Sequence, residues 1–168
     1  MKKILINTIS IFIISTILHF IYNIFPNFIT SIFTPVNESI FEHLKLIFTS
    51  TFLYTIISNI FTKEKNIFLI SLLKGILTII ILLIIYLPIR YLFGEVLIVT
   101  LIILFISILL SEIIINNTIK KEYKILNIIS IFLIIINYII FTHFTYNPIK
   151  TFLFYDTETK SYGIKEKQ

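Results

Sequence analysis

The chain has 168 residues, of which 57% are hydrophobic and 14% are charged, and its mean hydropathy is +0.99. This apolar fraction lies above that of ordinary soluble domains. The length suits one bundle of about four to six spans, at roughly 20 residues for each crossing. There are no cysteines, which excludes disulfide bonds and thiolate metal sites. The composition therefore predicts an integral membrane protein without a separate globular domain.

Five apolar runs separated by short polar breaks predict five membrane-spanning helices. The runs cover residues 4–25, 38–61, 66–87, 95–116 and 125–144. A proline inside a helix removes a hydrogen bond, and each proline falls just outside a run: Pro26, Pro35, Pro88 and Pro148. The sequence thus predicts an all-α transmembrane helical bundle, with a helical domain at 1–148 and a short polar tail at 149–168.

Lysine and arginine are distributed unevenly between the two sides of the predicted bundle. Seven lysines lie on the side of the N-terminus, and the opposite loops carry only Arg90; the seven are Lys2, Lys3, Lys63, Lys65, Lys120, Lys121 and Lys124. The positive-inside rule therefore predicts a cytoplasmic N-terminus and, with five spans, an external tail.

The net charge of +5 is explained by this topology and by anionic lipid headgroups, so it implies no nucleic acid partner. The lipid bilayer is the expected partner. A membrane-protein partner or a second copy of the chain stays open.

The densest polar group lies at the outer start of the second predicted span. It consists of Asn37, Glu38, Ser39, Glu42, His43 and Lys45. A charge at a helix centre costs about 2.5–3.5 kcal/mol on insertion scales. Each of these side chains therefore needs a polar partner in the protein, contact with water or a position at the membrane interface. At about 100° per residue, Glu38, Glu42 and Lys45 share one face of the helix, while His43 points away from it.

Helix-end chemistry explains Asn37 as the N-cap and Glu38 as the acidic residue of the first turn. Glu42, His43 and Lys45 lie one to two turns deeper, where we expect a polar pocket or a protein-facing ion-pair network. An apolar side chain would suit the bilayer better than the Glu42 carboxylate. A carboxylate that is costly at this depth suggests a use, so we predict that Glu42 is the centre of the function. The alternative is that Glu42 forms a helix-end pair with Lys45.

The run Asn37-Glu38-Ser39-Ile40-Phe41-Glu42-His43-Leu44-Lys45 resembles the signature of a family of small uncharacterised bacterial integral membrane proteins, which usually has Trp where this chain has Phe41. The resemblance extends to three further segments: Leu18-His19-Phe20-x-Tyr22, Lys74-Gly75 and Phe154-x-Asp156-x-x-Thr159-x-x-Tyr162-Gly163-Ile164. It implies a multi-pass protein of the bacterial cytoplasmic membrane, and it implies no activity.

The predicted orientation places all three histidines near outer helix ends, namely His19, His43 and His143. Together with the carboxylates of Glu38 and Glu42, these imidazoles are able to bind a divalent transition metal or to relay protons. The alternative is that each histidine is an interfacial side chain with its polar edge among the headgroups. These residues do not have the close spacing in the sequence that is typical of metal ligands. The sequence therefore does not decide whether a metal or a cofactor binds.

Two further charges, Lys74 and Glu112, lie nearer the predicted cytoplasmic side. Their depths differ by only about 6 Å at 1.5 Å per residue, so an intramembrane ion pair would lower the insertion cost of both. Alternatively, Glu112 reaches the interface and Lys74 extends towards it along its own stem. Both interpretations stay open.

Catalytic signatures are missing from the sequence. There is no His-Glu-x-x-His, no Gly-x-Ser-x-Gly and no glycine-rich phosphate loop, and the chain has only three glycines. An enzyme is therefore not the favoured interpretation. Two other classes of function are favoured. One is a small transporter or sensor that uses the outer polar cluster, and the other is a non-catalytic structural or accessory subunit of a membrane complex.

Overall fold

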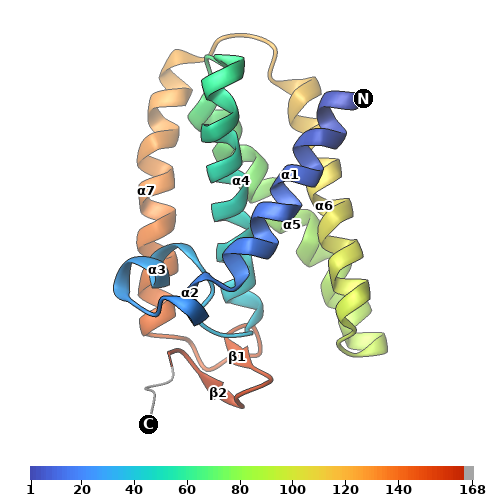
Figure 1. Cartoon of the computed structure of the whole chain (residues 1–168), viewed down its shortest axis with the longest axis vertical. Helices are drawn as coiled ribbons and strands as arrows, with labels where there is room; N and C mark the ends of the chain where they lie inside the picture. The colour runs from blue at the N-terminus through green and yellow to red at the C-terminus, as the bar shows by residue number, and fades with distance from the viewer. Residues whose placement is uncertain (165–168) are drawn as a thin grey trace.

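The computed structural model describes residues 1–164 and shows a bundle of long helices with a small hairpin at one end (Figure 1). Residues 165–168 of the predicted tail lie outside the described residues. The helices are α1 (Lys2–His19), α2 (Ile21–Ile24), α3 (Phe28–Phe33), α4 (Ile40–Thr62), α5 (Ile67–Phe93), α6 (Leu97–Thr118) and α7 (Lys124–Tyr146), and the strands are β1 (Tyr155–Asp156) and β2 (Ser161–Tyr162).

Within residues 1–164, five helices are long and apolar enough to cross a membrane. The first is the stretch Lys2–Ile24, formed by α1 and α2, and the others are α4, α5, α6 and α7. The predicted all-α bundle with five spans is therefore confirmed. The side of the membrane on which each end lies stays a prediction.

The exterior of the bundle is apolar. Leu97 on α6 and Ile125 on α7 are 72% and 74% exposed, and many other isoleucines, leucines and phenylalanines also face outward. A soluble monomer rarely exposes contiguous apolar surface on this scale. These faces suit contact with lipid chains.

Helix α5 does not end before Pro88, as the sequence predicted, but continues through it to Phe93. A proline lacks the N–H that would bond the preceding turn, so it removes one helical hydrogen bond. The lost hydrogen bond lies in the last two turns of α5. The helix ends after Phe93, where Gly94 N donates to the Arg90 carbonyl at 2.9 Å. The extra turns bring Arg90 Nη2 to 3.2 Å from Glu95 Oε2.

Helices α4 and α5 form the centre of the bundle. Helix α1 packs on α4 and α6, and α7 packs on α5 (Figure 1). Gly75 permits the close approach of α5 to α4, because a Cβ at this position would lie 2.6 Å from Cδ2 of the fully buried Phe48 ring. Only a hydrogen atom fits at this contact.

The two ends of the bundle differ in structure and charge. The end that carries the strands and segment 25–39, which contains α3, is called the hairpin end. The end that carries the N-terminus and the loops 63–66 and 119–123 is called the basic end. The positive-inside rule predicts that the basic end faces the cytoplasm.

The described part of the tail folds back onto α4. Strands β1 and β2 pair antiparallel, and the Asp156 carboxylate accepts a hydrogen bond from Glu158 N at 2.9 Å within their turn. Phe41 N donates to the Leu153 carbonyl at 2.9 Å, and the rings of Phe41 and Phe154 stack with centroids 4.5 Å apart. The hairpin thus covers the start of α4.

The contact at Gly75 predicts a stability effect. Gly75→Ala should lower the stability of the detergent-solubilised protein by about 1–3 kcal/mol, because overpacking against Phe48 outweighs the roughly 1 kcal/mol that alanine contributes to a helix. Thermal unfolding measures the change, with Ile84→Leu on the exposed face of the same helix as the control. A variant with wild-type stability or better would contradict this close contact.

Candidate metal centre

Helix α4 begins at Ile40, two residues later than predicted, and Ser39 rather than Asn37 is its N-cap. The Ser39 hydroxyl accepts a hydrogen bond from Glu42 N at 3.4 Å. Asn37 instead accepts from Ser39 N at 3.0 Å and donates from Nδ2 to the Gly163 carbonyl at 2.9 Å. Asn37 therefore joins the loop before α4 to the C-terminal segment.

The later start of α4 separates Glu38 from the helix face that it was predicted to share with Glu42 and Lys45. Glu38 precedes the helix, and its carboxylate contacts His19 and His43 instead. Two distinct polar groups result. One contacts α7 through Glu42 and Lys45, and the other contacts α1 through Glu38 and His43.

The first group is a buried ion pair. Lys45 Nζ lies 2.6 Å from Glu42 Oε2, and the two side chains are 0% and 2% exposed. The Thr145 hydroxyl donates to Glu42 Oε1 at 2.7 Å and accepts from Lys45 Nζ at 2.9 Å. Lys45 also donates to the Ser31 carbonyl at 2.7 Å, and Val36 N donates to Glu42 Oε2 at 3.1 Å.

These contacts satisfy both oxygens of Glu42 and all three N–H bonds of Lys45. A buried pair is tolerated when its remaining lone pairs and protons find partners in this way. The pair holds α4 against α7 and against the segment that contains α3. This arrangement favours a structural role for Glu42 over the functional centre that the sequence suggested.

The second group brings two histidines and a carboxylate together. Nε2 of His19 lies 3.1 Å from Nε2 of His43, and both nitrogens face Glu38 Oε2, at 3.3 Å and 3.4 Å respectively. Nδ1 of His43 lies 2.8 Å from the Ser39 carbonyl oxygen. A carbonyl cannot donate, so Nδ1 of His43 carries a proton, and Nε2 is the ring nitrogen that faces the cluster.

Three atoms of the kinds that bind metals, Nε2 of each histidine and Oε2 of Glu38, therefore lie close together. Hydrogen bonds from His19 and then from His43 hold the pKa of the Glu38 carboxyl below its usual range, so the group is a carboxylate. Electron-rich atoms at these distances repel one another unless a positive charge lies between them. A proton or a metal cation supplies that charge.

The spacing fits a tetrahedral metal ion. With metal–ligand bonds of about 2.0–2.1 Å, two ligands of a tetrahedral ion lie about 3.3–3.4 Å apart, and the three sides measure 3.1, 3.3 and 3.4 Å. Two imidazoles and one carboxylate are a known ligand set of zinc sites that keep an open position. The Ser39 carbonyl orients His43 as an outer-shell partner, whereas Nδ1 of His19 is buried and has no hydrogen-bond partner among residues 1–164.

A cavity of about 420 Å³ adjoins this cluster, between α4, α5, α6 and the hairpin. Glu38 and His43 line it on one side, apolar residues such as Leu82 form its walls, and Glu95 and Thr157 also line it. The Thr157 hydroxyl donates to Glu95 Oε2 at 3.3 Å, which joins the hairpin to the start of α6. A ligand in this cavity would reach both Glu38 and His43.

The structure does not bring His143 to this cluster, contrary to the predicted grouping of three histidines. Among residues 1–164, the group able to hold a metal consists of His19, Glu38 and His43. His143 lies on the exposed side of α7, and its ring packs against Phe144. Because Thr145 faces α4, the side chain two residues earlier points about 160° away from it.

At the other end of the bundle, Lys74 and Glu112 form an ion pair, as in the first of the two interpretations. Lys74 Nζ lies 2.5 Å from Glu112 Oε1, and the side chains are 9% and 1% exposed. Asn7 Nδ2 donates to Glu112 Oε2 at 2.8 Å, and the Tyr54 hydroxyl donates to Asn7 Oδ1 at 2.6 Å.

Sequence reasoning missed the neutral partners of these charges, namely Ser31, Thr145, Asn7 and Tyr54. Asn7 and Glu112 are separated by 105 positions, and Glu42 and Thr145 by 103. Serine, threonine, asparagine and tyrosine are frequent throughout the chain, so residue type alone does not distinguish these positions. Only the packing of the helices does.

The fold is an all-α bundle in which five helices of residues 1–164 are long and apolar enough to span a membrane, and a polar cluster lies at the hairpin end. The chain belongs to a family of unknown function, DUF6512, which matches residues 1–164. No curated protein and no solved structure matches the chain. The family thus carries no activity over to this protein.

The buried pair predicts strong non-additivity. Lys45→Met leaves the Glu42 carboxylate buried and unpaired, which should cost about 3–5 kcal/mol, whereas the double variant Glu42→Leu/Lys45→Met should recover most of that loss. Thermal unfolding in detergent measures both, and Lys65→Met at an exposed ion pair is the control, with little expected change. Additive losses from Glu42→Leu and Lys45→Met would rule out a coupled pair.

Proposed function

We propose that this protein binds a divalent transition metal ion, zinc above all, through His19, Glu38 and His43. It acts as a small transporter or sensor of that ion in the bacterial cytoplasmic membrane, with the hairpin end outside. The observation that carries the proposal is the triangle of two imidazole nitrogens and one carboxylate oxygen, with sides of 3.1–3.4 Å.

The two polar groups at the hairpin end differ in a way that supports this assignment. The pair of Glu42 and Lys45 is complete, since protein groups satisfy all its atoms. The cluster of His19, Glu38 and His43 is of another kind, because it brings two imidazole nitrogens and one carboxylate oxygen within 3.1–3.4 Å of one another. A purely structural or accessory subunit has no need of such a set of metal ligands.

The types of ligand support zinc over the abundant hard cations. Magnesium and calcium select oxygen ligands, at least six in number for calcium and usually including several waters for magnesium. Neutral imidazole suits zinc, copper, iron and nickel, and zinc accepts a mixed set of nitrogen and carboxylate ligands. The ion would sit between the end of α1 and the start of α4, within reach of the external solution in the predicted orientation.

Titration of the purified full-length protein with Zn²⁺ tests this proposal. We expect one Zn²⁺ per chain, and we expect His19→Ala and His43→Ala each to weaken binding at least about tenfold, since even outer-shell changes at metal sites cost 10–100-fold. Isothermal titration calorimetry in detergent measures the affinity. His143→Ala is the matched control, because this histidine lies apart from the cluster, and it should bind as wild type does.

Two results would contradict the proposal. One is a wild-type protein that binds no Zn²⁺. The other is a loss of affinity for His143→Ala as large as that for His19→Ala, because it would show that histidines bind the ion without regard to the cluster.

A further inference from the structure

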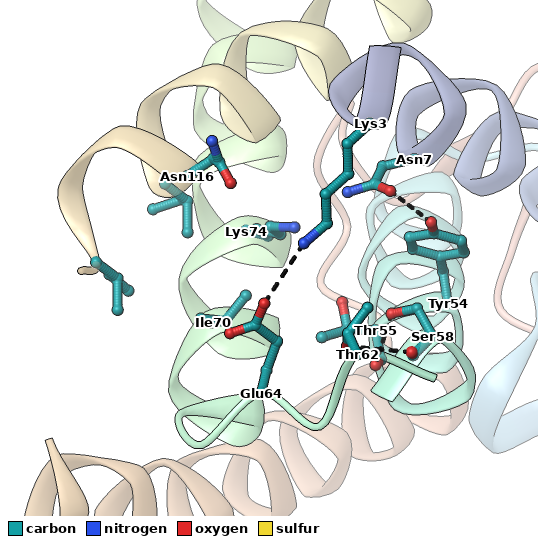
Figure 2. A pocket seen from close by; sticks show the side chains of 12 residues that line it. Lys3, Asn7, Tyr54, Thr55, Ser58, Thr62, Glu64, Ile70, Lys74 and Asn116 are labelled. Carbon is teal, nitrogen blue, oxygen red and sulfur yellow. Dashed lines mark hydrogen bonds and ion pairs between the residues drawn. The ribbon is translucent and has the colours of Figure 1, made fainter. Parts of the chain in front are cut away.

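A second polar cavity, of about 120 Å³, lies at the basic end of the bundle between α1, α4, α5 and α6 (Figure 2). Lys3 and Lys74 both line it, and Figure 2 shows their amino groups pointing into the same space. The proposed metal centre lies at the opposite, hairpin end. This cavity is therefore a separate site with a different kind of lining.

The charged groups in the wall of the cavity are mainly cationic. Two ammonium groups line it, and Glu64 supplies the one carboxylate among the lining residues. The side-chain amides of Asn7 and Asn116 also face it. An ammonium is a hydrogen-bond donor only, and an amide nitrogen donates as well. Such a wall suits a ligand that accepts hydrogen bonds and carries negative charge.

Lys74 is a buried lysine with spare donors. Its side chain is 9% exposed, and its Nζ lies 2.5 Å from Glu112 Oε1. An ammonium has three N–H donors, and among residues 1–164 Glu112 is the acceptor of Lys74. Lys45 at the hairpin end has acceptors from Glu42, Ser31 and Thr145 instead. The remaining donors of Lys74 are available to a ligand in the cavity that it borders.

Lys3 supplies the second cation, at the mouth of the cavity. Its Nζ lies 3.5 Å from Glu64 Oε1, and the two side chains are 61% and 49% exposed. An exposed pair at this distance contributes little stability. The Lys3 ammonium sits on a flexible four-carbon stem, so it is free to turn towards a stronger acceptor inside the cavity.

The charge around the cavity also favours an anion. At the basic end, the seven lysines named above stand against two loop carboxylates, Glu64 and Glu122. The Glu112 carboxylate adds no net charge to this balance, because it is paired with Lys74. A surplus of one sign raises the local concentration of ions of the opposite sign. In the predicted orientation, this end also faces the anionic headgroups of the cytoplasmic leaflet.

The size of the cavity limits the part of a ligand that it is able to enclose. A volume of 120 Å³ corresponds to about four water molecules at about 30 Å³ each. This is the scale of one phosphate group with its four oxygen atoms. Pockets that enclose drug-sized ligands measure about 300–1,000 Å³. Any larger remainder of the ligand must therefore lie outside the cavity.

We propose that this cavity binds a phosphate group, with the ammonium groups of Lys3 and Lys74 as its cationic partners and the Asn116 amide as a further donor. The group belongs to the headgroup of an anionic lipid or to a free phosphate, which share this chemistry. Basic pockets between membrane-spanning helices on the cytoplasmic side bind phosphorylated headgroups in other proteins. The inference is independent of the proposed metal centre.

Two titrations of the delipidated full-length protein test the inference, in a metal-free buffer and a nonionic detergent without phosphate. One uses inorganic phosphate and the other a short-chain phosphatidic acid, and isothermal titration calorimetry measures the affinity. We expect one bound phosphate group per chain. Lys3→Gln should weaken binding at least about tenfold, because it removes a charge-assisted hydrogen bond.

Lys65→Gln is the matched control for Lys3→Gln. It also removes an exposed lysine at the basic end, but Lys65 pairs with Glu122 and does not line the cavity. Its affinity should stay within about twofold of wild type, because exposed pairs contribute little.

The double variant Lys74→Gln/Glu112→Gln tests the buried side of the site. It removes both charges together, so it leaves no unpaired charge in the interior. We expect it to weaken phosphate binding at least about tenfold as well, since the buried ammonium is lost. Thermal unfolding shows whether the variant is folded. Lys3→Gln, at an exposed position, keeps the test decisive if it is not.

The two titrations also distinguish the sources of the phosphate group. An affinity for the phosphatidic acid at least about tenfold above that for inorganic phosphate assigns the group to a lipid headgroup, and a smaller ratio assigns it to free phosphate. Three results would overturn the inference. They are no saturable binding of either probe, wild-type affinity in Lys3→Gln or in the folded double variant, and equal losses in Lys3→Gln and Lys65→Gln.

Discussion

The structure depends on the pairing of the buried Glu42 carboxylate with the Lys45 ammonium inside an apolar bundle. A charge in such a bundle is costly unless protein groups satisfy it. Glu42 and Lys45 meet this requirement through Thr145, Ser31 and Val36. The resulting contacts fix α4 against α7, so the start of α4 has one rotation about its axis, which turns His43 towards α1 and His19.

The three groups of titratable side chains differ in how they are built and buried. The pair formed by Glu42 and Lys45 is complete and holds helices together. The cluster of His19, Glu38 and His43 brings three potential metal ligands together, which supports the proposed metal centre. At the basic end, the Glu112 carboxylate is paired with the Lys74 ammonium.

The five spans were predictable because apolar runs and short breaks follow from the thickness of the bilayer. The prediction failed at Pro88 because a single lost hydrogen bond does not end a helix near its last turns. It also grouped Glu38 with Glu42, because helical periodicity was extended two residues too far. The pairing of Glu38 with His19 depends on how α1 packs against α4, which one sequence does not show.

The central claim is that two imidazoles and one carboxylate bind a metal ion between α1 and α4. X-ray absorption spectroscopy of the Zn²⁺-loaded, detergent-solubilised protein tests it most directly, because imidazole ligands produce characteristic outer-shell scattering. The account predicts two imidazoles per zinc, with bonds of about 2.0–2.1 Å and light-atom ligands completing a four-coordinate shell. A shell of oxygen atoms alone, without imidazole scattering, would contradict the account.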